Sequence, residues 1–165
     1  MYFRWWRACA MTLALSLIPV AATFAHGEGS GPAKSRGQLV YVSAYSHVYI
    51  LNDKRKLYLS VTLSFRNTDP DYPVTVRSIR YYDSGGQLVR EFIDEPVTVP
   101  PLATVERVVG RSDKSGGSGA NFLLDWSAEQ PVSPPIIESV MVSAGAGSSA
   151  LGFARSGHVI QEHQD

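Results

Sequence analysis

Apolar and polar residues alternate with a period of two along much of this chain, and this pattern limits its possible folds more than any other feature. From Leu57 to Phe65 five apolar residues alternate with mostly polar ones, and residues 120–128 repeat the pattern. Successive side chains of a β-strand point to opposite faces, so the alternation predicts strands with one buried face. Further segments rich in β-forming residues are 39–45, 74–82, 87–93, 97–99, 105–109 and 136–143.

Turn-forming residues lie between these segments. Asp83-Ser84-Gly85-Gly86 predicts a hairpin, because glycine reaches the positive φ angles that tight turns need. A shift of the apolar phase between Val76 and Ile79 predicts a β-bulge. The prolines within residues 131–135 mark a strand end, because proline donates no hydrogen bond to a neighbouring strand.

The number of short strands and the absence of a sustained helical period predict an all-β fold. An antiparallel β-sandwich accounts best for short strands separated by frequent turns, and we expect its topology to be immunoglobulin-like. A small β-barrel is the alternative, because a period of two does not distinguish a barrel from a sandwich. Trp126 stands in phase with its apolar neighbours, so we expect it in the core rather than at a ligand.

The first 25 residues have the composition of a secretory signal peptide. Arg4 and Arg7 precede an apolar run at residues 8–22, and Thr23 and Ala25 are small residues at the two positions that the signal peptidase reads. This run is shorter than the roughly 20 apolar residues that span a bilayer, so we expect cleavage after Ala25 rather than a membrane anchor. Cleavage removes Cys9, the single cysteine, so the exported chain would form no disulfide.

The expected organisation has four parts. They are a signal peptide at 1–25, a flexible Gly/Ser/Pro-rich leader at 26–37, a β-sandwich domain at 38–160 and a polar tail at 161–165. Loss of two arginines from the 15 basic residues, against 15 acidic ones, gives a net charge of −2. This balance leaves no basic excess for phosphates, so we expect no nucleic-acid partner. Because cleavage removes the apolar run, we also expect no stable membrane insertion of the exported chain. Lys54-Arg55-Lys56 is the largest charge block and is predicted to be a solvated turn.

Five short segments occur in a distinctive order. They are Asn67-Thr68-Asp69-Pro70, Tyr81-Tyr82-Asp83 with Gly86 and Leu88-Val89, Pro101-Leu102-Ala103-Thr104, Ser115-Gly116-Gly117-Ser118-Gly119-Ala120-Asn121-Phe122, and Pro134-Pro135-Ile136. Together they resemble a family of bacterial exported proteins classed only as a domain of unknown function, over roughly residues 37–160. The resemblance implies export and an immunoglobulin-like fold, and it carries over no activity, cofactor or catalytic residue.

The glycine-rich loop raises the question of catalysis. Its residues of interest are Gly116, Gly117, Ser118, Gly119 and Asn121. A hydrolase nucleophile needs Gly-x-Ser-x-Gly on a strand-to-helix turn, whereas Ala120 takes the last position here and a strand follows. His47 or His158 could supply a base, but nothing in the sequence places either near Ser118. A turn into the next strand therefore explains the loop better, and a serine hydrolase is the least favoured function.

A more specific chemistry depends on where the signal peptide is cleaved. Cleavage after Ala25 would leave His26 first, and its amine and imidazole could chelate copper. A second histidine, His47 or His158, would complete the nitrogen set that Cu(II) favours. The flexible leader opposes this reading, because a good site needs rigid ligands.

Tyrosines are concentrated early in the domain. Tyr41, Tyr45, Tyr49 and Tyr58 are ordinary β-strand residues, but they also form the one broad feature that indicates a binding surface. We therefore expect an exported protein, periplasmic or secreted, that acts as a non-enzymatic binding or structural module of the bacterial cell envelope. Its partner would be a protein or glycan, and no cofactor is expected. A copper-binding protein is the alternative.

Overall fold

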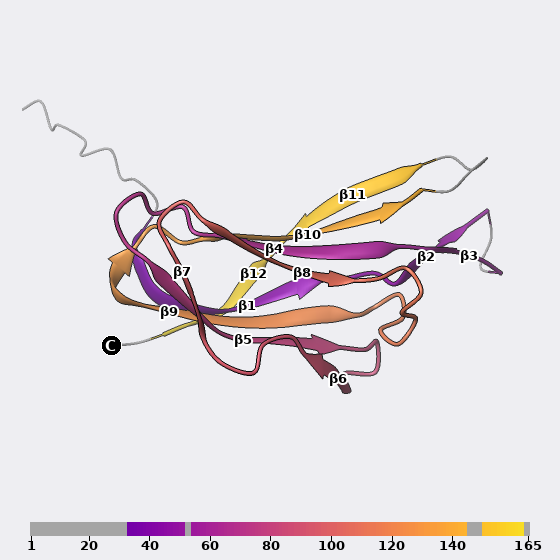
Figure 1. Ribbon diagram of the computed structural model, residues 1–165. Coiled ribbons are helices and arrows are strands. Elements are labelled where there is room, and N and C mark those ends of the chain that lie inside the picture. The colour runs from indigo at the N-terminus through magenta and orange to yellow at the C-terminus, as the bar shows by residue number, and fades with distance from the viewer. Residues whose placement is uncertain (1–32, 52–53, 145–149, 164–165) are drawn as a thin grey trace, which may run out of the picture. The chain divides into compact units, whose positions relative to one another are not determined.

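The computed structural model describes residues 33–51, 54–144 and 150–163, which form β-strands and their connections (Figure 1). The strands are β1 (Ser35–Ser43), β2 (His47–Ile50), β3 (Arg55–Tyr58), β4 (Ser60–Arg66), β5 (Val74–Tyr82), β6 (Leu88–Glu91), β7 (Val97–Val99), β8 (Thr104–Val109), β9 (Asn121–Val132), β10 (Ile136–Ser143), β11 (Leu151–Ser156) and β12 (His158–Glu162). Contacts divide the chain into units Met1–Ser30 and Gly31–Asp165, and all these strands belong to the second. The predicted signal peptide, and most of the predicted leader with His26, lie outside the described residues.

Two antiparallel sheets form the body of this unit. One has the order β12-β1-β9-β5-β6, with β7 also paired to β5, and the other has the order β11-β10-β4-β8. Strands β2 and β3 form a separate two-stranded hairpin. The sheets do not close on each other, so the predicted antiparallel β-sandwich is confirmed and the alternative barrel is wrong. An immunoglobulin-like topology is compatible with this strand order and stays a prediction.

The core lies between the two sheets and follows the sequence alternation. Val61, Leu63 and Phe65 of β4 are buried, as are Leu124 and Trp126 of β9. Each such side chain contributes about 1.5–3 kcal/mol when it is fully removed from water. Trp126 is therefore a core residue, as predicted.

Two local predictions on β5 are confirmed. The pairing of β5 with β9 shifts its register between Val76 and Ser78, which is the expected bulge. The turn from β5 to β6 is closed by Asp83, whose carboxylate accepts hydrogen bonds from Gly85 N and Gln87 N at 2.8 Å each. Gly86 has a φ of 78° there, which explains the glycine.

The chain passes from one sheet to the other at Gly157, between β11 and β12. Its amide donates to Ile137 O at 2.7 Å, and a Cβ at this position would lie 2.6 Å from Val40 Cγ1. No side chain fits at that distance, so the crossing requires glycine. It places β12 beside β1, where Gln38 pairs with Glu162.

Some boundaries differ from the sequence expectation. β1 begins at Ser35, inside the predicted leader, and β12 includes Glu162, inside the predicted tail. The predicted strand through Leu59 is divided into β3 and β4, because Leu59 N donates to Ser46 O rather than to a neighbouring strand. Lys54, Arg55 and Lys56 are exposed, as predicted, but only Lys54 lies in a turn, because Arg55 and Lys56 begin β3. None of the described residues forms a helix long and apolar enough to cross a membrane.

Candidate functional site

The hairpin of β2 and β3 is fixed at its base to the sandwich. Ser46 N donates to Gly117 O at 2.9 Å, and Ser46 O accepts from Leu59 N at 3.0 Å. The Ser46 hydroxyl also lies 3.1 Å from the buried Tyr81 hydroxyl. These bonds connect the hairpin to both the glycine-rich loop and the end of β5.

One face of the hairpin is aromatic. His47 pairs with Tyr58 and Tyr49 pairs with Lys56, and directly opposite residues of an antiparallel pair share a face. The His47 ring lies 5.2 Å from the Tyr49 ring and 5.8 Å from the Tyr58 ring. His47 is only 7 % exposed, whereas Tyr49 is 51 % exposed. The histidine therefore acts as a buried spacer between two phenol rings.

Two lysines lie over these tyrosines. Lys56 Nζ is 5.7 Å from the centre of the Tyr49 ring, and Lys114 Nζ is 4.6 Å from the centre of the Tyr58 ring. A cation is attracted to the face of an aromatic ring at such distances. We call His47, Tyr49, Lys56, Tyr58 and Lys114 the aromatic–cationic face. Its combination of positive charge and phenol rings suits an anionic ligand.

His47 is neutral on this face at neutral pH. Burial lowers its pKa below the usual value of 6.5, and the charge of Lys56 lowers the pKa further. Its Nε2 atom is buried and makes no hydrogen bond within the described chain. The positive charge of the face therefore comes from its lysines.

The tip of the hairpin breaks the alternation of the sequence. Val48, Tyr49, Ile50 and Leu51 are four consecutive apolar or aromatic residues. Leu51 is 88 % exposed and has a φ of 65°. This left-handed conformation costs a residue with a Cβ about 1–2 kcal/mol. Neither the exposure nor the conformation of Leu51 stabilises the fold.

The glycine-rich loop lies next to the hairpin base and has a structural explanation. A Cβ at Gly116 would collide with the Tyr81 hydroxyl, and Gly117 has a φ of 79°. Ser84 Oγ donates to Gly116 O at 3.0 Å and accepts from Gly119 N at 2.8 Å. The glycines therefore allow the loop to pack on Tyr81 and Ser84.

The predicted tyrosine surface is divided in the structure. Tyr49 and Tyr58 share the hairpin face. Tyr41 instead lies on β1 opposite His158 of β12, and the Tyr45 ring packs on Phe153 at 5.8 Å. The four residues therefore do not form one surface.

The candidate copper ligands His47 and His158 lie apart, whereas the candidate nucleophile Ser118 follows Gly117, whose carbonyl accepts from Ser46 N next to His47. His158 pairs with Tyr41, six residues before His47 along a mostly extended chain, so the two histidines are separated by on the order of 15–20 Å. Within residues 33–51, 54–144 and 150–163 no group of three His, Cys, Asp or Glu side chains could hold a metal. In the same ranges Ser118 is hydrogen-bonded to neither histidine. Asn121 pairs in the sheet with residues of β1 and β5.

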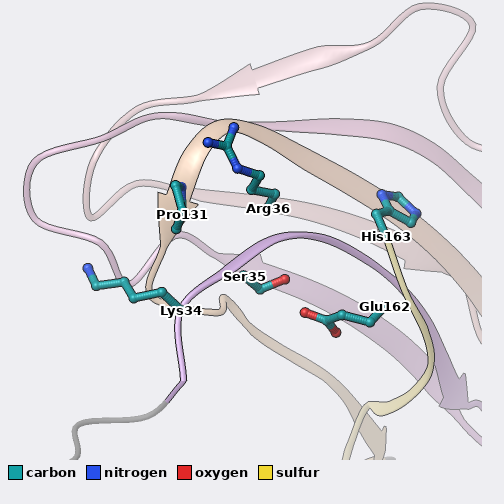
Figure 2. Close-up of a pocket in the computed structure, with 6 residues that line it drawn as sticks. All are labelled: Lys34, Ser35, Arg36, Pro131, Glu162 and His163. Carbon is teal, nitrogen blue, oxygen red and sulfur yellow. The ribbon is translucent and has the colours of Figure 1, made fainter. Parts of the chain in front are cut away.

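A shallow polar depression of about 190 Å³ lies where β1, the end of β9 and the end of β12 meet (Figure 2). It is lined by Lys34, Ser35, Arg36, Pro131, Glu162 and His163. Lys34 is paired with Asp69 at 3.2 Å, Arg36 donates to Glu129 O at 2.6 Å, and His163 lies 3.3 Å from Asp125. The basic side chains of the depression are therefore engaged by neighbouring protein groups, and their contacts connect the strand ends rather than form a ligand site.

The sequence interpretation missed the two lysines of the face. Lys56 was expected in a solvated turn, and Lys114 lies 56 positions after Tyr58 along the chain. The β-forming residues Val48, Tyr49 and Ile50 could have indicated a strand before the basic block, and a hairpin of this strand with the next would have placed Tyr49 opposite Lys56. No local signal connects Lys114 to Tyr58, because the loop reaches the hairpin through tertiary structure.

Comparisons with known proteins identify a family without an activity. A family model described as "Protein of unknown function (DUF3124)" matches residues 37–160. A solved structure, described as "Crystal Structure of Thermotoga maritima 1070", is similar with a TM-score of 0.44 and 14 % sequence identity. That match covers 79 % of this chain and 98 % of the other. No curated protein matches the chain.

Proposed function

The chain belongs to the DUF3124 family, whose function is unknown, and from this premise we propose that it is an exported, non-enzymatic binding module of the bacterial cell envelope, periplasmic or secreted. It binds an anionic partner on the aromatic–cationic face. The signal-peptide pattern of residues 1–25 supports export. The all-β scaffold supports a binding role only weakly, because sandwich folds serve many functions.

One observation carries the proposal: two lysines lie over two tyrosines on a hairpin that stands apart from both sheets. A lone two-stranded hairpin is marginally stable in water, so its retention favours a role outside folding. Exposed phenol rings present apolar surface with a polar edge, which is typical of recognition surfaces. The lysines then restrict the partner to one with negative charge.

The test is a binding titration of residues 26–165, which contain the whole described core, against soluble acidic and neutral polymers. We expect polygalacturonate and polyglutamate to bind, dextran not to bind, and affinity to fall with added salt. A Tyr49→Ala/Lys114→Gln variant is expected to bind about tenfold more weakly, equal to about 1.4 kcal/mol.

Tyr41→Ala is the matched control, because it removes an exposed tyrosine from a different part of the molecule. Its affinity should equal that of the unchanged chain. Equal binding of dextran, or an equal loss with Tyr41→Ala, would show that the aromatic–cationic face does not bind anions.

A further inference from the structure

We propose that the anionic partner is an acidic glycan, a chain of sugar rings that each carry a carboxylate, and that His47 hydrogen-bonds one of its hydroxyl groups. This inference rests on the proposed function, because it names the class of partner that binds the same face. It goes beyond charge, since it matches the phenol rings to sugar rings. It also gives a role to a histidine nitrogen that the fold leaves unsatisfied.

The aromatic–cationic face repeats one arrangement twice. Lys56 Nζ lies 5.7 Å from the centre of the Tyr49 ring, and Lys114 Nζ lies 4.6 Å from the centre of the Tyr58 ring. Each phenol ring is therefore accompanied by one positive charge. In an acidic glycan each sugar ring is accompanied by one negative charge, so neighbouring sugars match the two ring–lysine pairs. An acidic peptide matches the charges alone.

The phenol rings offer surface to the faces of sugar rings. A sugar ring has hydroxyl groups around its rim and C–H groups on its faces, so its faces pack on aromatic rings, which are apolar with a polar edge. Tyr49 is 51 % exposed. The His47 ring meets it at an interplanar angle of 81°, which is an edge contact rather than a parallel stack. The Tyr49 ring therefore remains available to a ligand.

His47 places a hydrogen-bonding nitrogen between the two phenol rings. The residue is 7 % exposed, and its Nε2 atom is buried without a hydrogen bond in the described chain. The hydroxyl of its neighbour Ser46, in contrast, lies 3.1 Å from the Tyr81 hydroxyl. A neutral imidazole nitrogen either donates or accepts, and a sugar hydroxyl does both. A glycan therefore satisfies Nε2 in either form of the ring, whereas a carboxylate satisfies only the form in which Nε2 carries hydrogen.

The charges around His47 favour an anion over a metal ion. The ammonium groups of Lys56 and Lys114 lie over the rings on both sides of the imidazole, and they repel a cation. Asp113, the neighbour of Lys114 in the sequence, is paired with Arg90 at 2.7 Å. Its carboxylate is therefore engaged by another basic group, and the charge of Lys114 can act on a ligand.

The position of the hairpin suits a long, thin partner. In the described chain β2 and β3 pair with each other and with no other strand. Figure 1 shows them at the end of the sandwich where β4 begins, extending away from both sheets. A polysaccharide chain can therefore cross the aromatic–cationic face without contacting the faces of the two sheets.

The experiment compares two ligands of equal charge. Residues 26–165 are titrated at pH 7 with hexagalacturonate and with hexaglutamate, which carry the same number of side-chain carboxylates. We expect both to bind and hexagalacturonate to bind about tenfold more tightly, because it alone adds ring contacts and a hydroxyl for His47.

Three variants separate the parts of the site. His47→Phe keeps an aromatic ring but removes the nitrogen, and Tyr49→Leu keeps apolar volume but removes the flat ring. Each should weaken hexagalacturonate binding about three- to tenfold and change hexaglutamate binding by less than about twofold. Lys114→Gln should weaken the binding of both ligands by a similar factor, since it removes only charge.

His158→Phe and Tyr41→Leu are the matched controls. They make the same kinds of change at an exposed histidine and an exposed tyrosine that pair with each other on β12 and β1. Both ligands should bind these variants as they bind the unchanged chain. Hexaglutamate also serves as a folding control, because a variant with a disrupted hairpin would lose both ligands together.

Equal affinity for the two ligands would overturn the glycan partner and leave the proposed anion-binding function standing. Equal losses of both ligands in His47→Phe and Tyr49→Leu, or the same loss of hexagalacturonate in the matched controls, would also overturn the inference. Absence of binding to either ligand would remove the proposed function together with it.

Discussion

The segments before and after β4 differ in which side chains they bury and which they expose. After β4, the Asn67 corner (residues 67–72) buries polar groups and satisfies them. The Asn67 side chain donates to three carbonyls, Tyr72 O at 2.9 Å, Val99 O at 3.2 Å and Pro100 O at 3.0 Å. Before β4, the hairpin exposes leucine and tyrosine and leaves His47 Nε2 without a hydrogen bond in the described chain.

Asp69 completes the corner. Its buried carboxylate accepts from Ser133 N at 2.9 Å, from Asp71 N and Tyr72 N at 3.1 Å each, and from Lys34 Nζ at 3.2 Å. The hydrogen bond from Ser133 is the largest cause that lowers the pKa of Asp69 well below its usual range. A buried polar group satisfied in this way stabilises the fold.

The largest expected loss of stability comes from a substitution in the Asn67 corner. Asn67→Ala leaves three carbonyls without their donor at a buried position, and we expect a loss of about 2–4 kcal/mol of unfolding free energy. Tyr49→Ala on the hairpin should cost less than about 1 kcal/mol. Urea unfolding of both variants measures the difference. Equal losses of unfolding free energy in the two variants would show that the Asn67 corner and the hairpin contribute equally to stability.

A smaller effect is expected at the hairpin base, where the glycine-rich loop packs on Tyr81. Gly116→Ala places a Cβ against the Tyr81 hydroxyl and should destabilise the fold by about 1–3 kcal/mol. Tyr81→Phe removes that hydroxyl, so the double variant should lose less than the sum of the two single variants. Strict additivity in urea unfolding would contradict the proposed contact.

The smallest effect is a difference in pH dependence. The pKa of Asp69 is lowered by folding, so its stabilisation is full above the unfolded value of 3.8 and is lost as the pH falls through the folded value. The pKa of His47 is also lowered, so below pH 6.5 the unfolded chain takes up a proton first and stability falls with pH.

Melting temperatures measured from pH 8 to pH 3 separate these groups. His47→Gln should flatten the curve just below pH 6.5. Asp69→Asn should melt lower at pH 7, and this difference should begin to shrink below pH 3.8. An unaltered slope below pH 6.5 in His47→Gln would show that another group titrates there.

Sequence patterns predicted the parts of this fold that depend on near neighbours. Alternation indicated β4 and β9, and the phase shift after Val76 indicated the bulge. The patterns did not indicate β11, because Gly152 and Ala154 stand where polar residues would have to alternate with Leu151 and Phe153. The aromatic–cationic face was also out of reach, because Lys114 meets Tyr58 only through the tertiary fold.

The pairing of β12 with β1 affects the order in which strand edges are covered as the protein folds. One edge of β1 is covered only when β12 is available, since Gln38 and Tyr41 pair with Glu162 and His158. Until β12 is in place, β1 presents an open strand edge, the kind of surface that pairs with strands of other chains. The same pairing leaves the two ends of the domain adjacent, so a circular permutant opened elsewhere should keep the sandwich intact.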